Sequence, residues 1–380
     1  MVTFQKPYNI EISKLNFQLM QNDRLPYLQD LVDESEKLKN NAFSYFSDTD
    51  MLIWYLYQSK HLDKTHGRSL RTINEYRREL EQFINFFMQY HHEMNVYIED
   101  VVEGSLFKSL LPQHMRKYQE WLATKSPYAL KNGAYAHSTI ERKTTILKSF
   151  FSFLQRVDYI KEPLAQGFKI ANTRKEERPN RDLGPNAVVD LLDGFWKEQH
   201  YVMFTIVHVL TTTGIRNEEF CTLKVKDIRE NTILGGYTLK VIGKGNKERE
   251  IPLKKKVLES IELFRKVRGL SPLKTASRED PLFTTNRKKA YKPNYLSTYV
   301  SKEISTLYKA SGEEAIKITP HYFRHAFAII SRINNVDVYS IMRSLGHEHL
   351  KTTEIYLEKV FATENHAIHS WKPELFGEYI

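Results

Sequence analysis

The amino-acid sequence predicts a mainly α-helical protein with a small antiparallel β-sheet, divided into two domains. Apolar residues recur at helical spacing over most of the chain. The strand pattern lies in one place, where Tyr237–Ile242 and Arg249–Leu253 flank the turn residues Gly243-Lys244-Gly245-Asn246. Residues 172–182 are nearly all polar or charged and contain Pro179, which is typical of a linker.

This linker sets the predicted domain bounds. Residues 67–171 form a helical first domain, and residues 183–380 form the second domain, which holds the sheet. Residues 1–66 exceed this two-domain plan and are treated as an N-terminal extension. Its stretch 43–59 is rich in aromatic residues and is predicted to be helical in part, but it carries no chemical motif.

Three helices are predicted in the first domain. One begins near Ser69 and continues to Tyr90, and Thr72 and Glu75 in its first turns have the spacing of a capping box. The other two are placed at Leu111–Ala123, with Pro112 in the first turn, and, after a loop over Lys125–His137, at Ser138–Val157, where Ser138 and Glu141 form a second capping box.

The second domain is predicted to be helical outside its strand–turn–strand segment. Helical spacing indicates helices at Tyr201–Thr212, Asn217–Lys224, Lys255–Arg268, Lys292–Ala310, Pro320–Ile333, Val338–Leu345 and Thr352–Val360. Gly346 follows the sixth of these, at the position where a glycine commonly ends a helix.

Composition narrows the class of protein. The 380 residues include 56 Lys and Arg against 46 Asp and Glu, a formal net charge of +10, which suits a protein that binds a polyanion such as nucleic acid. No apolar run is long enough for a membrane span, and no signal peptide is recognisable. The single cysteine, Cys221, rules out an intrachain disulfide and fits a reducing cytoplasm.

Several short segments contain residues suited to phosphate chemistry. The chain lacks a P-loop, a Rossmann glycine fingerprint, a Gly-x-Ser-x-Gly elbow and any convincing metal-ligand spacing of its histidines. What remains is a set of cationic, imidazole and phenolic side chains in unusual local contexts, at Arg216, Lys244, His321, Arg324, His347 and Tyr356. Taken singly, each has an ordinary structural explanation, such as a surface arginine or a core tyrosine.

Taken in order, these segments resemble the tyrosine recombinase, or phage integrase, family. The resemblance is carried by TGIRNEEF (213–220), VIGKGNKEREIPL (241–253), HYFRHAFA (321–328) and LGHEHLKTTEIY (345–356), and it extends over roughly residues 69–365. It implies a two-domain, C-shaped clamp around DNA. The sequence departs from the family's common pattern at non-catalytic positions, such as Ala326.

The resemblance implies a covalent mechanism on Tyr356. The tyrosine hydroxyl would attack a DNA phosphate and form a 3′-phosphotyrosine, while Arg216 and Arg324 clamp the non-bridging oxygens, an arrangement that suits guanidinium groups. A phenol in water has a pKa of about 10, so the nucleophile needs assistance. His321 is the family's match for that base, and Lys244 for the general acid on the leaving 5′-oxygen.

The remaining implied roles are supporting. His347 would hydrogen-bond the phosphate, and Glu219 matches an acidic position that orients active-site groups. Positions predicted to contact DNA are Arg142, Lys143, Lys148, Lys247 and Arg249. No metal is expected, because the two arginines already stabilise the phosphate charge, and no cofactor is expected, because the covalent intermediate keeps the bond energy. Residues 362–380, with Trp371, Leu375 and Phe376 as apolar anchors, would pack onto a neighbouring subunit.

The expected partner is double-stranded DNA with an inverted-repeat core site, bound as a homotetramer on two sites, and an accessory directionality factor is a further expected partner. Strand exchange through a Holliday junction, for a mobile element or replicon at a bacterial nucleoid, would follow. Two alternatives stay open: a catalytically silent DNA-binding repressor or architectural protein, and a relaxing topoisomerase. Residues 1–66 are either a separate domain for accessory DNA sites or a helical extension of the first domain.

Overall fold

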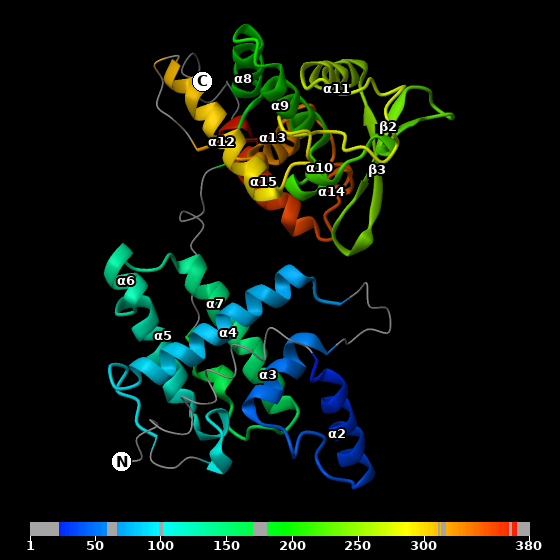
Figure 1. The fold of residues 1–380 in the computed structure, drawn as a ribbon. Coiled ribbons are helices and arrows are strands. Elements are labelled where there is room, and N and C mark those ends of the chain that lie inside the picture. The colour runs from blue at the N-terminus through cyan, green and yellow to red at the C-terminus, as the bar shows by residue number, and fades with distance from the viewer. Residues whose placement is uncertain are drawn as a thin grey trace. The chain divides into compact units, whose positions relative to one another are not determined.

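The computed structural model describes residues 23–58, 67–98, 102–169, 181–310, 312, 317–364 and 367–370. The chain divides into two compact units, Met1–Arg178 and Pro179–Ile380, here called the helical unit and the mixed unit (Figure 1). The predicted fold class, mainly α with a small antiparallel sheet, is confirmed. Within the described residues no helix has the length and apolar character that a membrane span requires. The predicted anchors Trp371, Leu375 and Phe376 lie outside the described residues.

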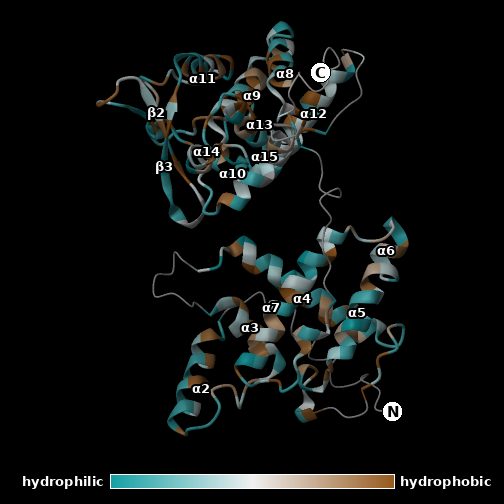
Figure 2. Ribbon diagram, turned by 180° about the vertical axis from the view of Figure 1, so that it is seen from behind, coloured by the Kyte–Doolittle hydropathy of each residue, from teal (hydrophilic) through white to brown (hydrophobic). Residues whose placement is uncertain are grey.

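The helical unit contains α2 (Leu25–Lys37), α3 (Asp48–Tyr57), α4 (Leu70–Tyr90), α5 (Pro112–Thr124), α6 (Pro127–Asn132) and α7 (His137–Arg156). The apolar faces of α2, α3, α4, α5 and α7 meet in one core, while polar residues lie outside (Figure 2). Aromatic rings join the helices: Tyr55 of α3 lies 5.1 Å from Phe150 of α7, and Phe83 of α4 lies 5.5 Å from Phe151. Helices α2 and α3 therefore share the core of α4, α5 and α7.

The predicted capping boxes of this unit are wrong. Ser69 is the N-cap of α4 and accepts a hydrogen bond from the Thr72 backbone N–H. Thr72 therefore lies inside the helix, where the Ser/Thr-x-x-Glu spacing also occurs without a cap. The second helix start falls at His137 after Ala136, with no side-chain cap, and the predicted loop 125–137 contains α6, whose N-cap is Ser126.

The mixed unit contains α8 (Pro185–Lys197), α9 (Tyr201–Thr213), α10 (Asn217–Thr222), α11 (Lys255–Val267), α12 (Pro293–Ala310), α13 (Pro320–Ile333), α14 (Val338–Leu345) and α15 (Leu350–Glu364). Helix α9 packs against α8, α11 and α13, and apolar residues such as Met203, Ile206 and Leu210 fill the core between them. The prediction missed α8, whose Gly194 and Pro185 weaken the helical signal.

The sheet has the order β1-β2-β3 and is antiparallel throughout. Strands β2 (Tyr237–Ile242) and β3 (Glu248–Leu253) pair from Tyr237 with Leu253 to Ile242 with Glu248, as the alternating pattern predicts. The third strand, β1 (Ile228–Glu230), is only three residues long, too short for the sequence pattern to reveal. The β2–β3 turn projects from the unit (Figure 1).

Candidate functional site

Two glycines place the helix ends that frame the site. Gly214 ends α9 and Gly346 ends α14, both in the left-handed conformation with φ of 60° and 63°. A Cβ atom on Gly214 would lie 2.9 Å from Phe327 and Leu345 atoms, so this position requires glycine on two grounds. The backbone carbonyls beside these turns consequently point at side chains rather than at a continuing helix.

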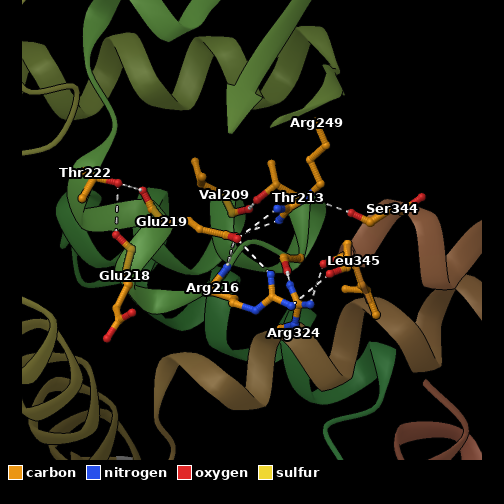
Figure 3. A network of polar contacts seen from close by, with 12 residues as sticks. Val209, Thr213, Arg216, Glu218, Glu219, Thr222, Arg249, Arg324, Ser344 and Leu345 are labelled. Atoms are coloured by element: carbon orange, nitrogen blue, oxygen red, sulfur yellow. Dashed lines mark hydrogen bonds and ion pairs between the residues drawn. The ribbon is translucent and has the colours of Figure 1, made fainter. Parts of the chain in front are cut away.

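Arg324 of α13 uses those carbonyls. Its guanidinium donates to the carbonyl oxygens of Gly214 and Leu345, at 2.6 Å each, and its side chain is almost fully buried (Figure 3). Burial, together with the charge of Arg216, lowers the pKa of Arg324 to about 10, so it remains a cation at neutral pH. The fold thus holds a charged group in place without neutralising it.

Arg216 lies at the start of α10 and is positioned by Glu219. The Glu219 carboxylate accepts hydrogen bonds from the Arg216 backbone N–H at 2.7 Å and from its Nη1 at 3.0 Å. Arg216 Nη2 also donates to the carbonyl of Gly346 at 3.1 Å, which links α10 to the end of α14. About a third of the Arg216 side chain is exposed, so it can still meet a ligand.

Arg249 of β3 completes this network from the other side of Glu219. Its two terminal nitrogens donate to the two carboxylate oxygens at 2.9 and 2.7 Å, and its Nε donates to the Ser344 carbonyl (Figure 3). Burial alone would raise the pKa of Glu219, but these hydrogen bonds and the charges of Arg249 and Arg216 lower it to about 2. That Arg249 contacts DNA stays a prediction, since its hydrogen-bond partners in the structure, Glu219 and Ser344, belong to the protein itself.

Three histidines surround the ring of Tyr356, which extends from α15. The ring centroid of Tyr356 lies 3.8 Å from that of His325, 5.3 Å from that of His347 and 5.8 Å from that of His321. His347 is fixed by a 2.8 Å hydrogen bond between its Nδ1 and the Thr353 hydroxyl. The next residue of α15, Leu357, is buried in a small core with Ala328, Ile341 and Leu345, against which Tyr356 also packs.

These histidines are neutral at physiological pH. Burial, with the charges of nearby arginines, lowers the pKa of His321 to about 4 and that of His347 to about 3. Burial, with His321 and the same arginines, lowers the pKa of His325 to about 3. A neutral imidazole can accept a proton, which a general base must do.

The structure brings five of the predicted residues together: Arg216, His321, Arg324, His347 and Tyr356, with Glu219 behind them. The side chain of Lys244 lies outside the described part; its backbone is in the β2–β3 turn, where Gly245 and Asn246 have positive φ. His325 was not predicted. The signal was present, because it follows His321 by four residues and so shares its helix face.

A cavity of about 430 Å³ opens beside the arginines. Four cationic side chains and two carboxylates line it: Arg216, Lys247, Arg249 and Arg343, with Glu248 and Glu348. Lys247 is exposed and forms an ion pair with Glu348. This cationic lining suits an anionic ligand such as a phosphodiester.

The residues of the helical unit that are predicted to contact DNA lie on α7, and two of them form ion pairs with acidic residues of α4. Arg142 pairs with Glu75, and Lys143 donates to Glu79 at 2.6 Å and also to Gln82. Lys148 is half-buried on the same helix. Their contact with DNA remains a prediction.

Known proteins with similar sequences point to one family. Residues 183–362 match the phage integrase family. A tyrosine recombinase XerC of Thermodesulfovibrio yellowstonii is 26% identical over 301 residues, which cover 78% of this chain and 88% of that protein. A tyrosine recombinase XerD of Staphylococcus haemolyticus is 29% identical over 302 residues, covering 76% of this chain and 88% of that protein.

Solved structures share the fold. A XerH site-specific recombinase bound to a palindromic difH substrate aligns with a TM-score of 0.57 and 20% identity, over 85% of this chain and 96% of that chain. A lambda integrase dimer bound to a COC′ core site aligns with a TM-score of 0.56 and 14% identity, over 88% of this chain and 87% of that chain. At these identities the similarity establishes the fold.

Proposed function

The chain belongs to the phage integrase family of tyrosine recombinases, and from this premise we propose that Tyr356 is the nucleophile of a site-specific DNA strand exchange. The observation that supports it most is the convergence of Tyr356 with two arginines and three histidines from α10, α13, the end of α14 and α15. DNA is the proposed partner, since the XerH and lambda integrase structures contain DNA sites.

The proposed step conserves the number of phosphoester bonds. The Tyr356 oxygen attacks phosphorus and loses its proton to His321, while the bond from phosphorus to the 5′-oxygen breaks. Lys244 supplies the proton to that oxygen, and Arg216, Arg324 and His347 stabilise the charge on the non-bridging oxygens. Attack by a 5′-hydroxyl of a partner duplex then releases the tyrosine and rejoins the strand.

We further propose a homotetramer that pairs two inverted-repeat core sites and exchanges strands through a Holliday junction, for a mobile element or a replicon. An accessory directionality factor would belong to the same proposal. The cationic predicted contacts Arg142, Lys143, Lys148 and Lys247 would hold the duplex backbone.

The nucleophile is tested by covalent capture. We expect the protein, incubated with nicked duplexes of randomised sequence, to retain DNA after denaturation, because departure of the nicked fragment traps the phosphotyrosine. Tyr356→Phe should retain none, whereas Tyr339→Phe, at an exposed tyrosine of α14, should retain the wild-type amount. DNA binding without any adduct would instead support the repressor alternative, and relaxation of supercoils without exchange would support a topoisomerase.

Residues 23–58 are proposed to be an integral part of the helical unit. The Asp48 carboxylate, at the start of α3, accepts hydrogen bonds from the Leu106 N–H at 2.7 Å and the Tyr159 hydroxyl at 2.9 Å. We expect deletion of residues 1–58 to unfold the helical unit and deletion of residues 1–22 to leave it folded, as judged by hydrogen exchange. A helical unit that remains folded without α2 and α3 would support a separate N-terminal domain.

A further inference from the structure

His325 lies between the candidate base and the candidate nucleophile. It follows His321 by one helical turn of α13, and the Nε2 atoms of the two imidazoles are 3.3 Å apart, within hydrogen-bond distance. The two rings meet edge to face at 83°, with centroids 4.8 Å apart. The other side of this contact is Tyr356, whose ring lies at 41° to that of His325.

The hydrogen bond between the two imidazoles restricts their tautomers. Two neutral rings can share it only if one Nε2 carries the proton and the other is the acceptor. If His325 donates, His321 must carry its own proton on Nδ1, and it then has no lone pair free to take a proton. If His321 donates, its Nδ1 is free to act as a base. The tautomer of His325 therefore decides whether His321 can act as a general base.

The surroundings favour two neutral rings. His325 is buried and faces His321, His347, Tyr356, Arg181 and Arg324, of which the two arginines are cations. Burial and those charges hold the pKa of both imidazoles far below 7. One ring must then donate and the other accept at neutral pH.

We propose that His325 is a positioning residue for strand cleavage: it accepts the Nε2–H of His321, which leaves Nδ1 of His321 free for the Tyr356 proton, and its ring holds the phenol in place. The inference rests on the proposed function. When Tyr356 attacks phosphorus, its proton moves to Nδ1 of His321, and the resulting imidazolium keeps its hydrogen bond to neutral His325. This is the arrangement in which a third group orients a general base.

The hydrogen bond is tested directly by nitrogen-15 NMR of the full-length protein labelled at histidine. We expect His321 to be protonated at Nε2 and His325 at Nδ1, with signals assigned from the His321→Gln and His325→Gln variants. In His325→Phe, which keeps an aromatic ring but loses the acceptor, His321 should become a mixture of tautomers. Protonation of His321 at Nδ1 in the wild type would overturn the proposal.

The consequence is tested by single-turnover adduct formation. We expect His325→Phe to be about 10- to 100-fold slower than wild type, within the range of acid–base contributions. His325→Gln, whose amide oxygen can reach the position of Nε2, should recover to within about five-fold of the wild type. Both variants should bind DNA as the wild type does, and their melting temperatures identify a variant that has failed to fold.

Two results of this kinetic test would overturn the proposal: His325→Phe reacting at the wild-type rate, or folded His325→Gln reacting as slowly as His325→Phe.

A third experiment uses a substrate with sulfur as the leaving atom, which needs no general acid. The His325→Phe defect should persist there, since it affects attack, whereas a Lys244→Ala defect should be relieved. If wild type itself forms no adduct, the proposed function fails, and the NMR result still decides the tautomers independently.

Discussion

The cations of the two units are neutralised in different ways. In the helical unit the exposed pairs Arg142–Glu75 and Lys169–Glu120 each match one cation with one carboxylate, and the half-buried Lys143 pairs with Glu79, which Arg78 also contacts. At the site of the mixed unit, Arg216 and Arg249 share Glu219, and Arg324 donates to two backbone carbonyls. Three guanidinium charges against one carboxylate leave a net charge of +2 in this set.

The two arrangements have different effects, because an ion pair cancels charge whereas a guanidinium held by carbonyl oxygens keeps its charge for a ligand. An exposed ion pair contributes only about 0–1 kcal/mol, and it leaves little charge for a ligand. Carbonyl oxygens, by contrast, fix the orientation of a guanidinium without cancelling its charge. A buried cation that lacks a counterion is unfavourable in the isolated protein, but it is pre-organised for an incoming phosphodiester. The uneven pairing therefore indicates where the anion belongs.

The sharpest test compares two buried arginines of the mixed unit. Arg324 and Arg265 are both almost fully buried, and both donate to backbone carbonyls; those of Arg265 belong to Ser271, Pro281 and Leu282. We expect Arg324→Lys to slow adduct formation about 10²- to 10³-fold, because a lysine cannot bind two carbonyls and a phosphate with one planar fork. The rate is measured in single-turnover cleavage.

Arg265→Lys is the matched control. Its guanidinium donates to carbonyls of residues 271, 281 and 282, none of which belongs to the candidate site, so we expect a lower melting temperature with an unchanged cleavage rate per folded molecule. If both variants lost cleavage in proportion to their loss of stability, Arg324 would be a structural residue like Arg265.

Local signals in the sequence predicted the helices that hold this site better than they predicted the hydrogen bonds between its side chains. The bounds of α13 and α14 were predicted to the residue, because Pro320 and Gly346 mark the start and the end by backbone conformation alone. The bidentate contact of Arg249 with Glu219 spans 30 residues and depends on how β3 packs against α10, which no local pattern encodes. The prediction that Arg249 contacts DNA used only its charge, because the sequence does not show that Glu219 is its partner.

A second prediction removes the shared carboxylate. Glu219→Gln should slow adduct formation about 10-fold, because Arg216 loses the charge-assisted hydrogen bonds that set its orientation, although the net positive charge of the site rises. Glu348→Gln is the control, since Glu348 is an exposed carboxylate that pairs with Lys247. A faster Glu219→Gln enzyme would mean that net charge matters more than orientation.

A third prediction concerns pH. The folded-state pKa values of His321, His325 and His347 lie at about 4, 3 and 3, below the usual value of about 6.5 for histidine. The unfolded chain therefore takes up protons first as the pH falls, and the free energy of unfolding of the mixed unit should decrease from about pH 6.5 towards pH 4. Urea unfolding followed by hydrogen exchange measures this slope, and His347→Asn should flatten it. An identical slope in that variant would contradict the lowered pKa.

The smallest expected effect comes from the helical unit, where removal of one carboxylate would leave a paired cation without its ion-pair partner. Glu75→Gln removes the carboxylate that pairs with Arg142 and should raise DNA affinity about two- to five-fold, with a steeper salt dependence, if Arg142 then meets a phosphate. Stability should change by less than about 1 kcal/mol, because the pair is exposed. Glu120→Gln, which frees Lys169, is the matched control away from α7. Equal gains in the two variants would reflect net charge alone, whereas a gain confined to Glu75→Gln would place α7 against the duplex and show that this carboxylate restrains binding.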